Sequence, residues 1–159
     1  MNNPYKINTY RLLSMDEYLS NEQLILTKVN TFITSFNTYY KEEFIKLEVT
    51  STLCKDLINK DSIIGFYNYD NLLVGLSVFT IDSPWYNPKM RVIEEIFSLS
   101  LYKGCGLINA LSHALTTFGK INNCDIAVMA NGSPLYGKLY SNSMRDSSWS
   151  RYNTYYKIL

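Results

Sequence analysis

The sequence predicts an α/β (α+β) protein with a mixed, mostly antiparallel central sheet and helices on both faces. Two amphipathic helical segments precede residue 60. Two apolar, strand-like segments then flank the turn residues Asp70-Asn71, as in a hairpin. Residues 91–121 have the pattern of a strand, a glycine-bearing turn and a helix. Hairpin strands that feed a strand–helix–strand crossover give a mixed sheet with helices on both faces.

The first third of the chain predicts one strand and two helices. Residues 5–13 alternate as a strand does, and Ser14 to Glu17 have the capping-box pattern that begins a helix. Apolar residues at helical spacing continue this helix, or helix pair, to about Tyr40. A second helical segment is expected within 42–59. Its buried side is expected to include Leu53, Leu57 and Ile58.

The rest of the chain predicts alternating strands and helices. The strands are expected over 63–69, 72–81, 92–101 and 124–130, with one strand or a kinked pair over 149–159. The helices are expected over 107–121 and from Ser133 onward. The predicted order is therefore β-α-α-β-β-β-α-β-α-β, where the last strand is single or double.

The composition is that of a folded, nearly neutral chain. Its 159 residues fit one domain, 1–159, and 47% of them are apolar. With 15 basic and 14 acidic residues the formal net charge is +1, so no nucleic-acid partner is expected. The three cysteines lack metal-site spacing and there is one histidine, so no metal site is expected. Unpaired thiols fit a reducing compartment.

No segment predicts targeting to a membrane. The start of the chain lacks a basic stretch followed by an apolar run, so no signal peptide is expected. No apolar run approaches the roughly 18 residues of a membrane span. We therefore expect a cytoplasmic protein. Frequent Tyr and Asn are compatible with an AT-rich genome, such as that of a low-GC bacterium or a virus. For a viral protein, the expected location is the host cytoplasm or the virion.

The turn Lys103-Gly104-Cys105-Gly106 is the most informative short motif. Glycine permits positive φ and lets a ligand approach the backbone closely. Because a helix follows, unpaired N–H groups and the positive end of a helix dipole can bind a phosphate or pyrophosphate. The alternative is that the two glycines before the helix only form a tight turn and bind no ligand. The dinucleotide-binding fingerprint fails, since position 109 is Asn, and the Gly-Lys-Ser/Thr of a Walker loop is absent.

The element order around this turn resembles that of the GNAT superfamily of acyl-CoA-dependent N-acetyltransferases, and the resemblance covers nearly the whole chain. The chain looks like a phage-type or divergent member of this superfamily. The family loop has the pattern Gln/Arg-x-x-Gly-x-Gly/Ala, and the corresponding residues are Leu101-Tyr102-Lys103-Gly104-Cys105-Gly106. Both glycines match, Lys103 is a basic substitute, and Leu101 departs from the polar position. A late family helix often has Leu-Tyr-x-x-x-Gly-Phe. Leu139-Tyr140 matches its start without the Gly-Phe, and Leu135-Tyr136 is a competing register.

The resemblance implies that acetyl-CoA is the co-substrate and that it binds around the glycine turn. The residues that would hold its pyrophosphate through backbone amides are Lys103, Gly104, Cys105, Gly106 and Leu107. The main chain of Phe97, Ser98 and Leu99 would contact the pantetheine arm and the thioester. The arm would pair with the free edge of this strand as an extra strand does.

The implied reaction is direct attack of a primary amine on the thioester, which needs a base for the amine proton. Glu94 and Glu95 lie on the central strand and are expected to point to opposite faces, one of them toward the acceptor. The alternative is that both are ordinary charges at a strand end. Tyr140, or Tyr136 in the competing register, is the candidate acid for the CoA thiolate. The alternative is a half-buried helix tyrosine.

The acceptor is expected to be a small-molecule amine or a peptide or protein amine. The first helices and the 82–90 loop would select it, and their sequences are particular to this chain. The alternative is a GNAT-like fold without catalysis, which would be a binding or structural protein of viral origin. Leu101 and the missing Gly-Phe favour that alternative. A phosphate binder that uses the same loop is a third hypothesis, and a homo-oligomer is compatible with each.

Overall fold

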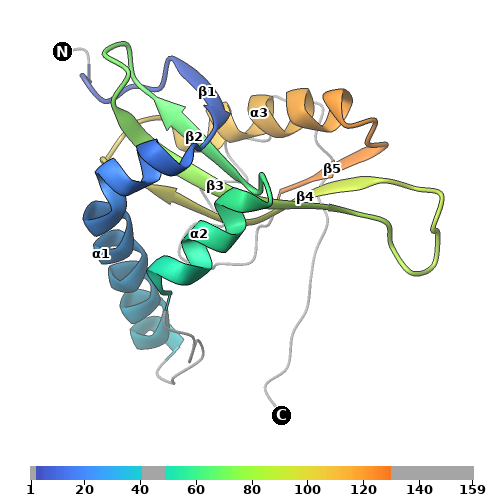
Figure 1. The fold of residues 1–159 in the computed structure, drawn as a ribbon, viewed down its shortest axis with the longest axis horizontal. Helices are drawn as coiled ribbons and strands as arrows, with labels where there is room; N and C mark the ends of the chain where they lie inside the picture. Colours follow the sequence, from blue (N-terminus) through green and yellow to red (C-terminus); the bar gives the residue numbers. More distant parts are fainter. Residues whose placement is uncertain (1–2, 41–48, 130–159) are drawn as a thin grey trace.

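The computed structural model of the protein describes residues 3–40 and 49–129, which contain three helices and five strands in the expected order (Figure 1). These elements are β1 (Thr9–Leu12), α1 (Met15–Tyr40), α2 (Ser51–Asn59), β2 (Ile63–Tyr67), β3 (Leu73–Asp82), β4 (Val92–Ser100), α3 (Leu107–Ile121) and β5 (Ile126–Val128). The helix predicted from Ser133 and the strand predicted over 149–159 lie outside the described residues.

The five described strands form one sheet in the order β1-β2-β3-β4-β5. The first four strands pair antiparallel, and β5 pairs parallel with β4 after the crossover through α3. The prediction of a mixed, mostly antiparallel sheet is confirmed. β3 and β4 form a long hairpin whose loop projects from the body of the molecule (Figure 1). β4 continues directly into the glycine turn, so its position decides where that turn lies.

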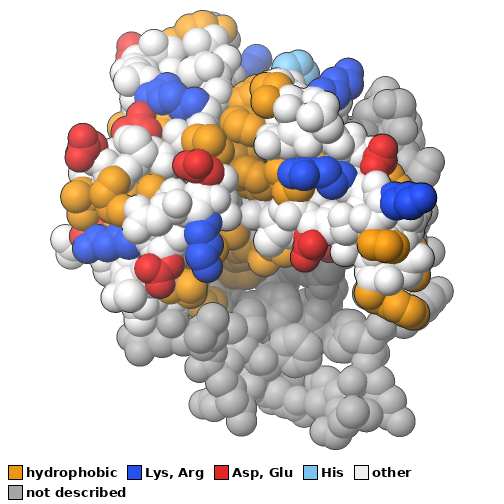
Figure 2. All heavy atoms as spheres, turned by 45° about the vertical axis from the view of Figure 1, so that its right-hand side comes forward, with side chains coloured by type: hydrophobic (Ala, Val, Ile, Leu, Met, Phe, Trp, Pro, Cys, Tyr) orange, Lys and Arg blue, Asp and Glu red, His pale blue; other side chains and the backbone are white. Residues whose placement is uncertain are grey.

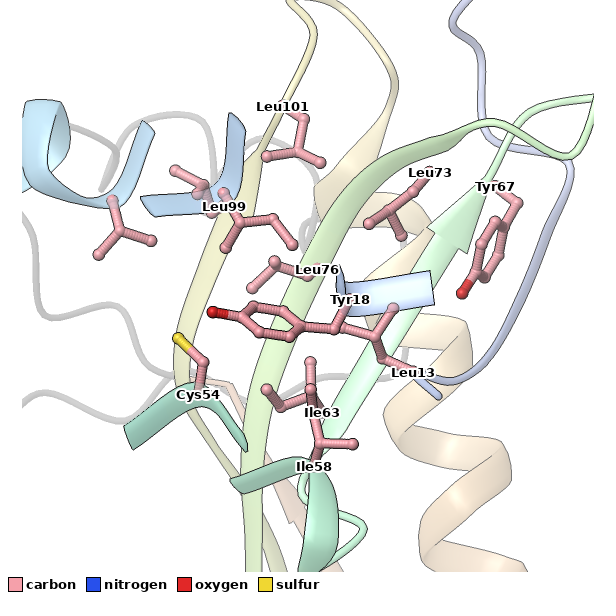
Figure 3. Packing of buried hydrophobic residues seen from close by; sticks show 12 residues of the cluster. Leu13, Tyr18, Cys54, Ile58, Ile63, Tyr67, Leu73, Leu76, Leu99 and Leu101 are labelled. Carbon is pink, nitrogen blue, oxygen red and sulfur yellow. The ribbon is translucent and has the colours of Figure 1, made fainter. Parts of the chain in front are cut away.

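Helices cover both faces of the sheet, as predicted: α1 and α2 lie on one face and α3 on the other (Figure 1). On the α1/α2 face the Tyr18 ring lies among sheet residues such as Leu76, with its hydroxyl toward Cys54 (Figure 3). Burial raises the pKa of Tyr18 to about 12. On the α3 face Leu111 and Leu115 are fully buried. Burying one such side chain stabilises the fold by roughly 1.5–3 kcal/mol.

The first strand is shorter than predicted. It begins at Thr9, because the preceding residues pair elsewhere. The Ile7 N–H donates to the Cys105 carbonyl at 3.0 Å, and only the Asn8 N–H reaches β2, at the Tyr67 carbonyl. The start of the chain therefore runs along the glycine turn. Two further strands are also shorter than predicted, β2 (Ile63–Tyr67) and β5 (Ile126–Val128).

The second helix begins at Ser51, whereas the sequence predicts only that it lies within residues 42–59. Thr50 caps it, and its Oγ1 accepts the Leu53 N–H at 3.3 Å. The predicted buried side is confirmed for Ile58, and Leu57 packs partly buried against the same core. Cys54 and Ile58 are buried, whereas Leu53 and Leu57 are half-buried.

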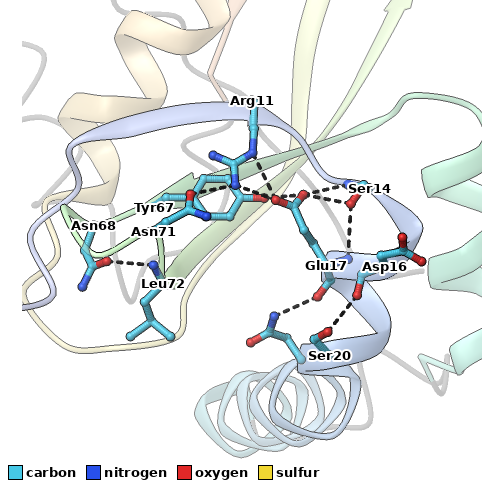
Figure 4. A network of polar contacts seen from close by, with 10 residues as sticks. Arg11, Ser14, Asp16, Glu17, Ser20, Tyr67, Asn68, Asn71 and Leu72 are labelled. Carbon is cyan, nitrogen blue, oxygen red and sulfur yellow. Dashed lines mark hydrogen bonds and ion pairs between the residues drawn. The ribbon is translucent and has the colours of Figure 1, made fainter.

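The turn between β2 and β3 is wider than the predicted two-residue turn. Asn68 follows β2, and its Oδ1 accepts the Asp70 N–H at 3.0 Å. The same oxygen accepts the Leu72 N–H at 2.8 Å (Figure 4). Asn71 takes a φ of 60°, which asparagine tolerates better than most residues. The Asn68 side chain thus supplements the backbone pairing across this turn, in which the Asn68 N–H donates to the Leu72 carbonyl at 3.0 Å.

The capping box predicted at the start of α1 is present. The Glu17 N–H donates to Ser14 Oγ (3.2 Å), and the Ser14 N–H donates to Glu17 Oε2 (3.1 Å). The same carboxylate accepts from Arg11 Nη2 (2.5 Å) and from the Tyr67 hydroxyl (2.8 Å) (Figure 4). Burial alone would raise the pKa of Glu17, but the hydrogen bonds from Ser14, Arg11 and Tyr67 outweigh it and lower the pKa to about 2. One carboxylate thereby joins β1, α1 and β2.

Candidate functional site

The turn between β4 and α3 has the left-handed backbone that its glycines allow. Gly104 has a φ of 76° and Gly106 a φ of 81°, where a side chain would be strained. Gly106 is the N-cap of α3 and has no side chain to bind the first turn. Within the described residues, no backbone acceptor binds the N–H groups of Leu107, Ile108 and Asn109. This helix end therefore presents unpaired donors and the positive end of the dipole.

The side chains of the turn divide between solvent and core. Lys103 and the two glycines are exposed. Cys105 is only 2% exposed, and its Sγ lies 3.6 Å from Ser100 Oγ. Leu107 is also buried, and Leu101 is buried in the core of the α1/α2 face. The turn therefore offers a ligand its main chain and the Lys103 ammonium.

One edge of β4 is paired along its whole length, and the other edge only in part. β3 pairs with residues 92–100, whereas β5 pairs only with residues 92–94. Beyond Glu94, no described strand pairs with this second edge. The main chain of residues 97–99 lies on the unpaired part, directly before the glycine turn. Such an edge has N–H and C=O groups available to an extended ligand.

A β-bulge at Ile96 interrupts β4. Val78 of β3 pairs with Phe97, and the next residue, Phe79, pairs with Glu95. Ile96 therefore has no partner in β3, and its insertion changes which face the following side chains occupy. The sequence alternation alone did not predict this change.

The two glutamates of β4 point to opposite faces and differ in exposure. Glu95 lies on the same face as Ile93, which packs under α3, and it is 2% exposed. Its carboxylate accepts a hydrogen bond from the Ser98 hydroxyl, which lies 2.8 Å from the Ser77 hydroxyl of β3. Glu94 is exposed. Glu95 is therefore not an ordinary charge at a strand end, and Glu94 is the carboxylate of the pair that is open to solvent.

After the bulge, the side chains of Phe97 and Leu99 belong to the core of the α1/α2 face. The Phe97 ring makes an edge contact with Phe32 of α1, with ring centroids 5.2 Å apart. Leu99 is 8% exposed in the same core. These two side chains are therefore occupied by packing in the core. A ligand at the β4 edge that no described strand pairs would contact their main chain.

Two surface hollows lie elsewhere on the described part of the molecule. One, of about 530 Å³, runs along α1 between Leu19 and Asn30. The other, of about 580 Å³, lies between the residues before β2, the end of β3 and the end of α3. Neither is lined by the glycine turn. Figure 2 shows acidic and basic side chains interspersed on one face, without a large patch of one sign.

Two further findings on the described residues concern metal ions and membranes. No group of three or more His, Cys, Asp or Glu side chains among them is placed to hold a metal ion. None of their helices has the length and apolar character of a transmembrane segment.

No protein-family model and no curated protein matches this chain in sequence, but many solved structures match it in fold. A GNAT family acetyltransferase from Staphylococcus aureus superposes with a TM-score of 0.61 at 14% identity, over 95% of this chain and 98% of that one. One from Listeria monocytogenes gives 0.60 at 10% identity, over 85% and 84%. The chain has the GNAT fold. A ribosomal-protein-alanine N-acetyltransferase from Brucella melitensis gives 0.60 at 17% identity, over 94% and 100%.

The GNAT fold confirms the resemblance drawn from the element order and the glycine turn. At identities of 10–17% this likeness concerns the fold, so the site is described by this chain's own residues. The two glutamates lie in the first half of β4, and the turn follows directly after its end. Tyr136 and Tyr140, the candidate acids, lie outside the described residues.

Two features of this region were not predicted from the sequence. The bulge at Ile96 had one local signal, the polar Ser98 placed three residues after Glu95, which a regular alternation would put on opposite faces. The contact of Asn3 with the turn had none, because it joins residues about a hundred positions apart: Asn3 Nδ2 donates to the carbonyls of Lys103 (3.1 Å) and Gly104 (3.0 Å).

Proposed function

We propose that this protein is an acyl-CoA-dependent N-acetyltransferase that moves acetyl from acetyl-CoA to a primary amine. The proposal depends chiefly on one observation: in a GNAT fold, the Gly104–Gly106 turn directly follows β4, whose second edge beyond Glu94 pairs with no described strand. The turn has the backbone donors that a pyrophosphate needs. The edge has the N–H and C=O groups that an extended, amide-bearing arm needs. CoA carries both chemical groups in one molecule.

In this proposal the pyrophosphate binds the amides of residues 103–108, and Lys103 adds a positive charge beside it. The pantetheine arm runs along residues 97–99. The thioester then lies near Ile96, the residue that the register of β3 leaves unpaired. We assign the polarisation of the thioester carbonyl, as the amine attacks, to a backbone N–H at this bulge.

The reaction needs one group that takes a proton and one that gives a proton. The amine nitrogen attacks the thioester carbon, the C–S bond breaks, and the thiolate of CoA leaves. We assign the amine proton to Glu94, directly or through a water molecule, because Glu94 is exposed whereas Glu95 is buried against Ser98. Tyr140 or Tyr136 remains the candidate donor to the thiolate. The acceptor is a small-molecule amine or a peptide or protein amine.

The deciding experiment is calorimetric binding of acetyl-CoA to the intact protein and to two variants of Gly104. Glu and Gln at this position have nearly the same shape and impose the same strain at a φ of 76°. Only Gly104→Glu adds a negative charge where the pyrophosphate is proposed to bind. Micromolar binding that Gly104→Glu loses to a greater extent than Gly104→Gln would support the site. No binding by the intact protein at millimolar acetyl-CoA would contradict it.

A second candidate function is a GNAT-fold protein that binds a partner and has lost catalysis. The observation that favours it is the loop between β3 and β4. Trp85 is 93% exposed and Tyr86 is 68% exposed, and the two rings contact each other edge to face. Exposed aromatic side chains of this kind are enriched at protein interfaces. Failure of acetyl-CoA binding, together with a partner whose binding is lost in Trp85→Ser, would favour this second function.

A further inference from the structure

The N-terminal segment 3–7 lies against one side of the glycine turn. Asn3 Nδ2 donates to two consecutive carbonyls, those of Lys103 (3.1 Å) and Gly104 (3.0 Å). The Ile7 N–H donates to the next carbonyl, that of Cys105, at 3.0 Å. Three successive carbonyls of the turn are thus held by one segment from the start of the chain.

Holding these carbonyls on one side directs the following amides to the other side. A trans peptide is planar, so its C=O and N–H point in opposite directions. The described chain contains no cis peptide bond. The carbonyls of residues 103, 104 and 105 share peptide planes with the N–H groups of 104, 105 and 106. These three N–H groups therefore point away from segment 3–7, and successive N–H groups of this kind form an anion-binding concavity.

The segment is itself fixed by contacts at each step. The Tyr5 ring stacks on Tyr102, with ring centroids 4.2 Å apart and planes within 5°. Asn3 Oδ1 accepts the Tyr5 N–H at 2.9 Å, which orients the Asn3 amide and leaves its Nδ2 for the turn. Asn68 Nδ2 donates to the Pro4 carbonyl at 3.0 Å. Asn3 is therefore a donor held in place before any ligand arrives.

We propose that Asn3 is a positioning residue for the pyrophosphate-binding turn. It holds the carbonyls of Lys103 and Gly104 away from the ligand, so that the amides of residues 104–106 already face it. This role rests on the proposed acetyl-CoA site and extends it to a residue outside the turn. A turn with two glycines has high backbone freedom, and a turn fixed in advance loses less entropy on binding.

The geometry of Gly104 supports this role. A Cβ at position 104 would lie 2.9 Å from Asn3 Nδ2, inside normal contact distance. Any side chain there would displace the Asn3 amide from the two carbonyls that it holds. The absence of a side chain at this position thus serves the approach of Asn3 as well as the positive φ of 76°.

The test compares Asn3→Ala with Asn122→Ala. Asn122 Nδ2 also donates to a backbone carbonyl, that of Phe118 at 2.8 Å, but at the opposite end of α3. NMR relaxation measures the order parameters of the 104–106 amides without ligand, and calorimetry measures the Kd of acetyl-CoA. For Asn3→Ala we expect lower order parameters at 104–106 with β4 unchanged, and roughly tenfold weaker binding. For Asn122→Ala we expect neither change.

The outcomes separate this inference from the proposed function. Unchanged order parameters at 104–106 in Asn3→Ala, or a loosened turn with an unchanged Kd, would overturn the role of Asn3 while acetyl-CoA binding by the intact protein stands. Loss of order throughout β4 would also overturn it, because Asn3 would then support the whole fold. If the intact protein does not bind millimolar acetyl-CoA, the proposed function itself is overturned, and the role of Asn3 in binding is overturned with it.

Discussion

Glu95 and Ser98, three residues apart on β4, share a hydrogen bond on one face of the sheet. In a regular strand, residues three apart point to opposite faces. The bulge at Ile96 brings them together, because it inserts one residue that β3 does not pair. A carboxylate that is 2% exposed thereby gains a hydroxyl donor from its own strand. The same bulge turns Phe97 into the α1/α2 core.

Removal of the Ser98 hydroxyl should destabilise the protein. In Ser98→Ala the Glu95 carboxylate stays buried and loses a hydrogen bond, which costs about 1–3 kcal/mol of unfolding free energy. Ser100→Ala is the comparison on the same strand, since Ser100 is exposed and its Oγ lies 3.6 Å from the Cys105 thiol, a weak hydrogen-bond donor. Urea unfolding at neutral pH measures both variants. Equal unfolding free energies would contradict the role assigned to Ser98.

Glu94 and Glu95 should have different effects when each is replaced by glutamine. If Glu94 takes the amine proton, Glu94→Gln should lower kcat by about 10²–10⁴-fold and leave the Kd of acetyl-CoA unchanged. Glu95→Gln should mainly lower the unfolding free energy, because Glu95 is buried and its carboxylate accepts a hydrogen bond from the Ser98 hydroxyl. Release of the CoA thiol in the presence of an acceptor amine, found by screening, measures kcat. A folded Glu95→Gln with lost turnover, beside an active Glu94→Gln, would assign the base to Glu95.

Much of the fold could be predicted because its signals are local in the chain. The capping box at Ser14 and Glu17 is set by two residues three apart, and α3 is set by the helical spacing that follows the turn. The positive φ of Gly104 and Gly106 could be predicted in the same way, since few other residues adopt it without strain.

The parts that could not be predicted depend on contacts between distant residues. The bulge at Ile96 is defined by how β3 pairs with β4, and no single strand specifies it. The role of Asn3 depends on a turn about a hundred residues later. The buried position of Cys54 follows from where α2 begins, and the sequence before Thr50 marks that start poorly. Local pattern therefore located the candidate site but not the contacts that shape it.

The Glu17 network should make stability depend on pH in mild acid. The pKa of Glu17 is lowered from 4.5 to about 2 in the folded chain. A carboxyl with a depressed folded pKa stabilises the fold above its unfolded pKa, and this contribution is lost as the pH falls from 4.5 toward 2. The unfolding free energy of the intact protein should fall over this window, and that of Glu17→Gln should fall less. Urea unfolding across the window measures the difference.

Two further variants control for this effect. Glu22→Gln removes a glutamate from the same helix outside the Arg11–Glu17 ion pair, so it should keep the pH dependence of the intact protein. Glu17→Ala removes the capping carboxylate altogether and should cost about 1–2 kcal/mol at neutral pH. If Glu17→Gln and Glu22→Gln follow the same pH profile, the network does not hold the Glu17 carboxylate in its charged form.

The two glycines of the turn should differ in their tolerance of a side chain. At Gly106, a Cβ would meet nothing within 4 Å, so the cost of Gly106→Ala is the strain of a φ of 81° alone. That strain is about 1–2 kcal/mol, and Gly106→Asn should lose less because asparagine visits this region more readily. Gly104→Ala should lose most, since it adds displacement of the Asn3 amide to the same strain. Chemical unfolding ranks the three variants. If Gly104→Ala is no less stable than Gly106→Ala, Asn3 does not hold the turn. If Gly106→Ala is as stable as the intact protein, residue 106 does not keep its left-handed conformation in solution.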